Sequence, residues 1–212
     1  MKKLCALWVM TLVFSSVCGA TIWAEVGDAG PLPGTAQATV GVGPLLTITG
    51  AIGSGIDADM YLIYVTGGTV FSASTVGTPG TLADTQLFLF NSAGLGVRAN
   101  DDCPTAPSFR SCLPAGFMLA EGLYYLVITG FDYDPVSAGG LIFPTVPFTG
   151  IFTATGPGGG SPIIGYSGAS GTGTYSISLT GASYAVIPEP TTMLLFGTGL
   201  AGALAARRRK KA

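Results

Sequence analysis

Ten acidic residues between positions 25 and 185 are the side chains of this sequence best suited to chemistry. Those predicted to lie at strand ends are Asp57, Asp59, Asp84, Asp101, Asp102, Asp132 and Asp134. Calcium takes about six to eight oxygen ligands, and acidic loops gathered at one end of a β-sandwich supply such oxygens. Asp84, Asp101 and Asp102 are therefore the predicted ligands of a calcium ion. In the alternative interpretation, the acids cap strands and form Asx turns without a metal.

The sequence contains no histidine, which excludes Ser-His-Asp and Cys-His catalytic groups and the HExxH zinc motif. Two carboxylates facing each other across a cleft can hydrolyse a glycosidic bond, but spacing along the chain does not show such a pair. We therefore expect no enzymatic activity.

Basic residues are concentrated at the two ends of the chain. Between Glu25 and Val186 only Arg98 and Arg110 are basic, against ten acids, so this part has a net charge of −8. Such a surface repels nucleic acid and anionic lipid. We expect no nucleic-acid partner.

Two of the four cysteines, Cys103 and Cys112, lie outside the N-terminal segment. In an exported protein such a pair favours a disulfide bond. The loop it closes is short, so its effect on the unfolded chain gives about 2–3 kcal/mol of stabilisation. Two free thiols are the alternative.

Residues 1–24 have the pattern of a signal peptide. Two lysines precede an apolar run from Leu4 to Phe14, which is too short to span a bilayer. Cleavage after Ala20 and cleavage after Ala24 both fit, and Ala24 is preferred because Trp23 is awkward close to a new N-terminus. An uncleaved anchor is the alternative.

The C-terminal residues 187–212 contain three parts in a fixed order. Pro188, Glu189 and Pro190 come first, and the two prolines hold this tripeptide extended and accessible. The apolar run 191–206 follows, and as a helix it is about 24 Å long, enough to cross a membrane with snorkelling basic residues. Five Arg and Lys residues then hold the far end in the cytoplasm.

This order of parts resembles the PEP-CTERM sorting signal. The resemblance implies recognition by an exosortase-type membrane transpeptidase, transient tethering in the membrane through 191–206, and cleavage near Pro188-Glu189-Pro190. It further implies delivery to the cell surface or extracellular space, across the inner membrane of a Gram-negative bacterium that makes exopolysaccharide. A permanently tail-anchored membrane protein is the alternative.

The residues between the two ends predict an all-β domain, an antiparallel β-sandwich of jelly-roll type. Short runs with strand character recur, and no segment shows sustained helical periodicity. Near the end of the domain, Tyr175, Ile177 and Leu179 alternate with Ser and Thr, as in a half-buried strand. Tyr61–Val65 and Leu123–Ile128 are apolar on both faces, which predicts central strands. The predicted strands are Leu45–Gly50, Met60–Thr66, Thr69–Thr75, Thr85–Phe90, Gly96–Asn100, Phe117–Ala120, Leu123–Thr129 and Thr174–Gly181.

The predicted sandwich occupies residues 44–186, after a flexible leader over 25–43. Within it, the Gly- and Pro-rich stretch 133–173 predicts an irregular excursion with one edge strand, Leu141–Phe143.

Several segments, taken in order, resemble bacterial pre-peptidase C-terminal domains, which are small β-sandwich modules of exported proteins. They are Asp57–Ile63, Asp84–Gly94, Asn100–Asp102, Ala120–Leu126 and Gly173–Ile177. The excursion from Tyr133 to Gly173 departs from the compact plan of that family. No protease precedes the module in this sequence, so a protease-associated role is not expected.

Two functional classes follow. The first is a structural or adhesive component of the cell surface or extracellular matrix. The second is a calcium-assisted module that binds polysaccharide or protein.

Aromatic residues within dense apolar strands are expected in the core, whereas a second group of aromatic residues is expected to make exposed contacts. That group comprises Phe131, Tyr133, Phe148, Phe152 and Tyr166.

Overall fold

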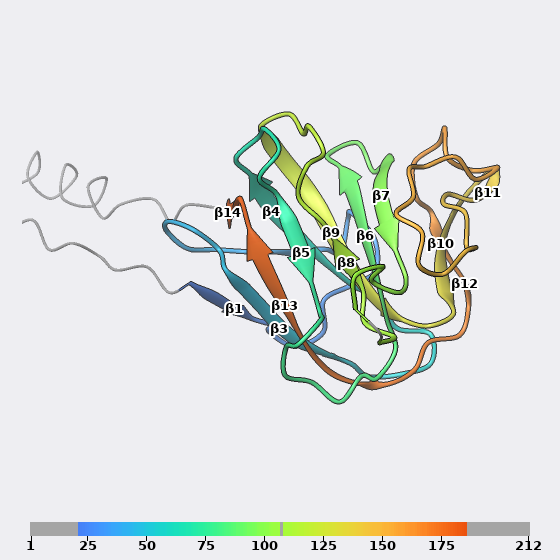
Figure 1. Ribbon diagram of the computed structural model, residues 1–212, viewed down its shortest axis with the longest axis horizontal. Coiled ribbons are helices and arrows are strands. Elements are labelled where there is room, and N and C mark those ends of the chain that lie inside the picture. Colours follow the sequence, from blue (N-terminus) through green and yellow to red (C-terminus); the bar gives the residue numbers. More distant parts are fainter. Residues whose placement is uncertain (1–20, 107, 186–212) are drawn as a thin grey trace, which may run out of the picture.

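The computed structural model describes residues 21–106 and 108–185, and these residues form β-strands joined by turns and loops (Figure 1). In chain order the strands are β1 (Ile22–Ala24), β2 (Gln37–Ala38), β3 (Thr47–Ile52), β4 (Asp59–Val65), β5 (Ser72–Ser74), β6 (Thr85–Asn91), β7 (Gly96–Asn100), β8 (Cys112–Leu113), β9 (Gly122–Gly130), β10 (Tyr133–Ser137), β11 (Gly140–Leu141), β12 (Gly165–Gly168), β13 (Gly173–Thr180) and β14 (Ala182–Tyr184). The described part of the chain holds no helix, so the predicted all-β class is confirmed.

The strands form three sheets. One has the order β1-β3-β13-β5-β8, a second has the order β14-β4-β9-β6-β7 with β2 beside β4, and a small third sheet has the order β11-β10-β12. Most neighbours are antiparallel, but β1 pairs with β3, and β2 with β4, in parallel. The two larger sheets are therefore mixed, which corrects the expectation of a purely antiparallel sandwich, whereas the third sheet is antiparallel.

The main core lies between the two larger sheets. Its buried side chains come from β3, β5 and β13 on one side and from β4, β6 and β9 on the other. In β13 the predicted alternation is confirmed for Tyr175, Ile177 and Leu179, which are buried, whereas Thr174, Ser178 and Thr180 are exposed. Ser176 is the exception, because it is buried on the face predicted to be exposed. A period of two residues places alternate side chains on opposite faces of a sheet.

A second core covers the other face of β4, β6 and β9. Met60, Phe88 and Val127, one from each strand, belong to a cluster completed by Ile142 and Phe143 from the Gly- and Pro-rich stretch. The strands β4, β6 and β9 are thus covered on both faces, which explains why they are apolar on both faces.

The stretch 133–173 is more ordered than predicted. It contains β10, β11 and β12, and of the expected edge strand Leu141–Phe143 only Leu141 lies in a strand. Its glycines allow close backbone packing, since a Cβ atom on Gly158 would lie 2.2 Å from the carbonyl oxygen of Gly140. The absence of side chains at such positions lets the excursion fold tightly onto the sheet.

Seven of the eight predicted strands overlap an observed strand. The exception is Phe117–Ala120, where only Leu119 pairs with Gly68 in an isolated bridge. Residues 25–43, predicted as a leader, contribute β2 and bury Ala29 in the main core.

The first and last strands lie at the same end of the domain (Figure 1). The rings of Trp23 in β1 and Tyr184 in β14 meet edge to face, with centroids 6.5 Å apart. Within residues 21–106 and 108–185 there is no helix with the length and apolarity needed to cross a membrane. The predicted sorting motif and apolar helix fall outside the described residues, as does most of the predicted signal peptide.

Candidate metal centre

Asp84, Asp101 and Asp102 lie together because β6 pairs with β7. These strands are antiparallel, with Leu87 opposite Asn100, so the start of β6 lies beside the end of β7. Asp84 immediately precedes β6, and Asp101 and Asp102 immediately follow β7. One carboxylate oxygen from each of the three acids lies within 4.8 Å of the others. Two oxygens that each lie about 2.4 Å from one calcium ion are at most about 4.8 Å apart, so this spacing fits a shared ion.

Two of these carboxylates carry a buried oxygen that has no hydrogen-bond partner within the described part of the chain. The two unpaired atoms are Asp84 Oδ1 and Asp101 Oδ1, and Asp101 as a whole is 7% exposed. Burial, followed by the negative charges of Asp102 and Asp84, raises the pKa of Asp101 to about 8. Burial and the charge of Asp102 raise the pKa of Asp84 to about 6. A bound cation would compensate the unfavourable burial of these carboxylates in their charged form.

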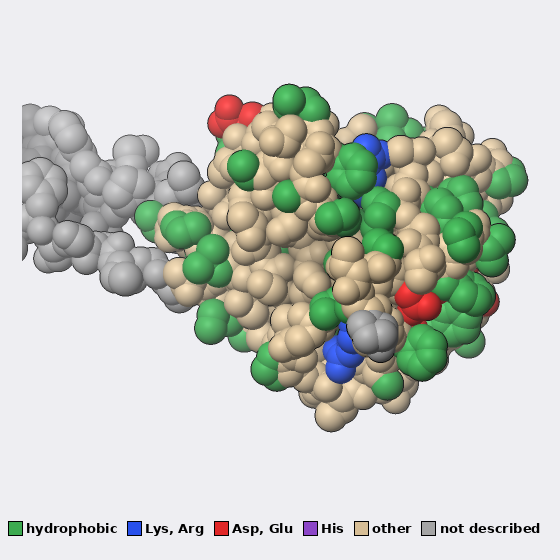
Figure 2. Space-filling model, viewed as in Figure 1, with side chains coloured by type: hydrophobic (Ala, Val, Ile, Leu, Met, Phe, Trp, Pro, Cys, Tyr) green, Lys and Arg blue, Asp and Glu red, His purple; other side chains and the backbone are tan. Residues whose placement is uncertain are grey.

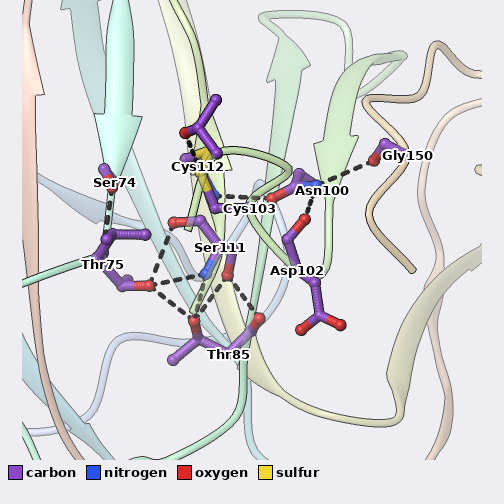
Figure 3. The surroundings of a disulfide bond; sticks show 11 residues. Ser74, Thr75, Thr85, Asn100, Asp102, Cys103, Ser111, Cys112 and Gly150 are labelled. Atoms are coloured by element: carbon purple, nitrogen blue, oxygen red, sulfur yellow. Dashed lines mark hydrogen bonds between the residues drawn. A yellow bond between two sulfur atoms is a disulfide. The ribbon is translucent and has the colours of Figure 1, made fainter. Parts of the chain in front are cut away.

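The predicted disulfide between Cys103 and Cys112 is present and fixes the chain next to the acids (Figure 3). Asn100 strengthens this support, because its Nδ2 donates to the carbonyl oxygens of Asp102 at 2.8 Å and Gly150 at 3.0 Å. Its Oδ1 accepts a hydrogen bond from the backbone N–H of Cys112 at 2.8 Å. The backbone of Asp102 is thereby held, and its carboxylate points away from these contacts (Figure 3).

Buried hydroxyl groups hold the start of β6, next to Asp84. The hydroxyl of Thr85 lies 2.7 Å from the hydroxyls of both Thr75 and Ser111 (Figure 3). The backbone N–H of Ser111 donates to both threonine hydroxyls. This network ties β6 to the segments before and after it. Hydrogen bonds therefore hold the backbone both next to Asp84 and at Asp102.

A small cavity lined by both polar and apolar side chains adjoins the acidic group. It measures about 10 Å³, and its lining includes Gln86, Asn100, Asp101 and Asp134. The side chain of Gln86 donates to Asp134 Oδ1 at 3.1 Å. Burial and the neighbouring Asp132 raise the pKa of Asp134 to about 7. A cavity of this size matches at most a single water molecule or ion.

Two exposed aromatic rings stand next to the acids. Phe131 and Phe148 are 37% and 46% exposed and meet edge to face, with centroids 5.5 Å apart. The backbone N–H of Asp102 donates to the carbonyl oxygen of Phe148 at 3.0 Å, and that of Phe131 donates to the carbonyl oxygen of Asp84 at 3.4 Å. The prediction that Phe131 and Phe148 are exposed is therefore confirmed. Figure 2 shows hydrophobic side chains gathered around acidic ones on the side of the molecule formed by β10–β12.

The other aromatic residues expected at the surface are partly buried. Tyr133 and Tyr166 stack with centroids 5.0 Å apart, and Phe152 packs against the second core. They support the excursion rather than presenting free rings.

The remaining acids predicted at strand ends separate into different places. Asp57 accepts a hydrogen bond from the backbone N–H of Gly53, four residues earlier, at 2.5 Å, which closes a local loop without forming an Asx turn. Asp59 lies instead beside Glu25 and Asp28, a group that the sequence analysis missed. Nothing in the pattern of the sequence brings Glu25 to Asp59, because the segment between them lacks periodicity.

The described residues thus form an all-β domain in which acidic residues are grouped at the ends of strands. Residues 186–210, which follow it, match the family model of the PEP-CTERM protein-sorting motif. The match includes Pro188, Glu189 and Pro190 and confirms the predicted motif. Such motifs mark proteins exported to the cell surface or extracellular space by exosortase systems of Gram-negative bacteria, and this chain carries one.

The match does not extend into the β domain, so the resemblance of that domain to pre-peptidase C-terminal domains stays a prediction. Comparison with curated proteins and with solved structures gave no match to this chain.

Proposed function

We propose that this protein is a non-catalytic structural or adhesive component of the cell surface or extracellular matrix, delivered there by an exosortase-type enzyme. The observation that carries the proposal is the position of the sorting motif. The last strand of the folded domain, β14, ends at Tyr184, and the motif begins at residue 186. The sorting signal follows the β domain directly, so the β domain is the part that sorting delivers.

The proposed route has four steps. A Sec-type pathway exports the chain, and signal peptidase removes the N-terminal segment. The apolar run 191–206 then tethers the chain in the inner membrane, with the basic tail in the cytoplasm. Cleavage near Pro188-Glu189-Pro190 releases the β domain or transfers it to an extracellular partner.

Intact mass measurement on the protein from its native host tests this route. We expect the mass of a chain that ends near residue 188 and is two hydrogen atoms lighter than its reduced form. In a strain without the exosortase, the same protein is expected to retain residues 191–212. Retention of these residues in both strains would make the chain a permanently tail-anchored membrane protein and would overturn the proposal.

A calcium-assisted polysaccharide-binding role is the second candidate. It is favoured by the position of Phe131 and Phe148, whose backbones hydrogen-bond to Asp84 and Asp102. A calcium ion held by the acids can take sugar hydroxyls as further oxygen ligands, while an exposed ring packs against the apolar face of the sugar. Ion and ring would then act on one ligand together.

Retention on immobilised exopolysaccharide tests the second candidate. We expect retention in calcium, loss in EDTA, and at least fivefold weaker binding by Phe148→Ala. Met118→Ala is the matched control, because Met118 is an exposed apolar side chain (76%) outside the pair formed by Phe131 and Phe148. Met118 precedes β9, whereas Phe131 follows this strand. Equal retention with calcium and with EDTA would rule out the calcium-assisted role without affecting the sorting proposal.

A further inference from the structure

A second group of carboxylates lies where the N-terminal segment meets the sandwich. One carboxylate oxygen from each of Glu25, Asp28 and Asp59 lies within 4.8 Å of the others. Glu25 immediately follows β1, Asp28 lies in the loop after it, and Asp59 is the first residue of β4. Two segments of the chain, the loop after β1 and the start of β4, therefore converge on this point.

Asp59 is the residue of this group that most needs a partner. It is 0% exposed, and its Oδ1 atom has no hydrogen-bond partner among residues 21–106 and 108–185. Its other oxygen accepts a hydrogen bond from the hydroxyl of Tyr175, and that hydroxyl also contacts the hydroxyl of Tyr61. The tyrosines therefore satisfy one oxygen of the buried carboxylate and leave the other directed at no donor. An unpaired buried carboxylate oxygen is strongly unfavourable.

Glu25 is held in place by its own hydrogen bonds. Its Oε1 accepts from the backbone N–H of Ala29 at 2.9 Å, and its Oε2 accepts from that of Ala51 at 2.9 Å. The first bond closes the turn that contains Asp28. The glutamate and the loop around Asp28 are thus positioned before any ligand arrives, which lowers the entropy lost on binding.

Within the described ranges 21–106 and 108–185, no arginine side chain compensates this negative charge. The two basic residues between Glu25 and Val186 are engaged elsewhere, since Arg98 donates to the carbonyl oxygen of Val97 and lies over the ring of Phe117. Arg110 donates to the carbonyl oxygen of Gly80. A cation from solution would supply positive charge at the carboxylates.

We propose that Glu25, Asp28 and Asp59 form a divalent-cation site, distinct from the one at Asp84, that fastens the N-terminal segment to the sandwich. The all-oxygen ligand set selects a hard cation such as calcium over zinc. The spacing of the oxygens fits one ion, the buried carboxylate of Asp59 has an oxygen without a hydrogen-bond partner, and the exposed Asp28 leaves room for water ligands. Binding joins the end of β1 to the start of β4.

Calcium binding and hydrogen exchange together test this site, with the full chain purified in detergent. Equilibrium dialysis gives the number of bound calcium ions, and exchange of the peptide covering residues 21–30 reports how firmly the N-terminal segment is held. In the wild-type protein we expect calcium to slow exchange of this peptide at least tenfold. The Asp28→Asn variant is expected to bind one ion fewer and to lose this calcium-dependent protection.

Two control variants separate this site from other effects. Asp57→Asn removes a nearby negative charge outside the group and is expected to behave as wild type. Asp102→Asn alters the other acidic group and is expected to leave the protection of residues 21–30 intact. Near-ultraviolet circular dichroism verifies that each variant is folded.

Two results would overturn the inference. One is an Asp28→Asn variant that binds as many ions as the wild type with unchanged protection of residues 21–30. The other is a wild-type peptide whose exchange is the same in calcium and in EDTA, which would indicate that Asp59 is accommodated as a neutral acid instead.

Discussion

The hydroxyl of Tyr184 donates a hydrogen bond to the backbone carbonyl of Ile22 at 3.2 Å, which joins the last strand of the domain to the first. Trp23, the next residue, donates its indole N–H to Gln37 Oε1 at 2.8 Å and packs against the main core. Strand β1 therefore belongs to the folded domain, although residues 22–24 fall within the predicted signal peptide.

This relationship predicts where signal peptidase cuts. Cleavage after Ala24 would remove β1 and its contacts with Tyr184 and Gln37, whereas cleavage after Ala20 keeps them. We expect the mature protein to begin at Thr21, as N-terminal sequencing of the exported chain would show. A mature chain that begins at Glu25 would contradict this prediction.

Calcium is expected to stabilise the protein through the group formed by Asp84, Asp101 and Asp102. Binding to the native state raises the melting temperature in proportion to the logarithm of the calcium concentration. The Asp102→Asn variant is expected to bind calcium at this group at least tenfold more weakly, because it loses one charged ligand. Calorimetric melting at several calcium concentrations measures the effect.

The control for this experiment is Glu121→Gln. Glu121 accepts a hydrogen bond from the hydroxyl of Tyr64, away from both groups of acids. This variant is expected to respond to calcium as the wild type does. An equal loss of response in Glu121→Gln and Asp102→Asn would show that calcium acts through general screening of charge.

The disulfide is expected to stabilise both the fold and the acidic group. The double variant Cys103→Ser/Cys112→Ser is expected to lose about 2–3 kcal/mol of unfolding free energy, because the unfolded chain gains the freedom of the opened loop. Its calcium affinity is expected to fall as well, since Asn100 connects Cys112 to Asp102. Urea unfolding and calcium titration measure the two effects.

Reduction of the wild-type protein provides the matching control. It opens the same loop without changing a residue, so the reduced protein and the double variant are expected to unfold at the same urea concentration. Unchanged stability after reduction would contradict the prediction.

Strand periodicity made much of the sandwich predictable from the sequence. Alternation in β13 identified which side chains are buried, and the two-sided apolar character of β4 and β9 identified them as central strands. Asp84 and Asp101 were grouped correctly because both flank predicted strands, and strand ends meet at sheet edges. Periodicity within a strand can be recognised in the sequence without knowledge of distant contacts.

Other features depend on contacts that no local pattern records. Strands β1, β2 and β14 have only two or three residues each, too few for a period to appear. The second acidic group brings Asp59 to Glu25 and Asp28, which lie more than thirty positions earlier in a segment that was predicted to be a leader. The order within 133–173 comes from close backbone packing at glycines, whereas glycine in a sequence is ordinarily a signal for loops.

The stability of the metal-free protein is expected to fall as the pH rises from about 4 to about 8. Burial is the main cause that raises the pKa of four carboxyl groups: to about 8 for Asp59 and Asp101, about 7 for Asp134 and about 6 for Asp84. The same groups titrate near pH 3.9 in the unfolded chain. In this window the native state binds more protons than the unfolded state, so each rise in pH favours unfolding.

Calcium should weaken or reverse that dependence, because the bound ion stabilises the charged carboxylates of the native state. Urea unfolding in EDTA at about pH 4.5, 6 and 7.5, repeated in excess calcium, measures both slopes. We expect the unfolding free energy to decrease with pH in EDTA and to change less, or to increase, in calcium. A stability in EDTA that rises with pH would mean that these carboxylates are paired in the metal-free protein, so that neither group needs a cation to compensate its charge.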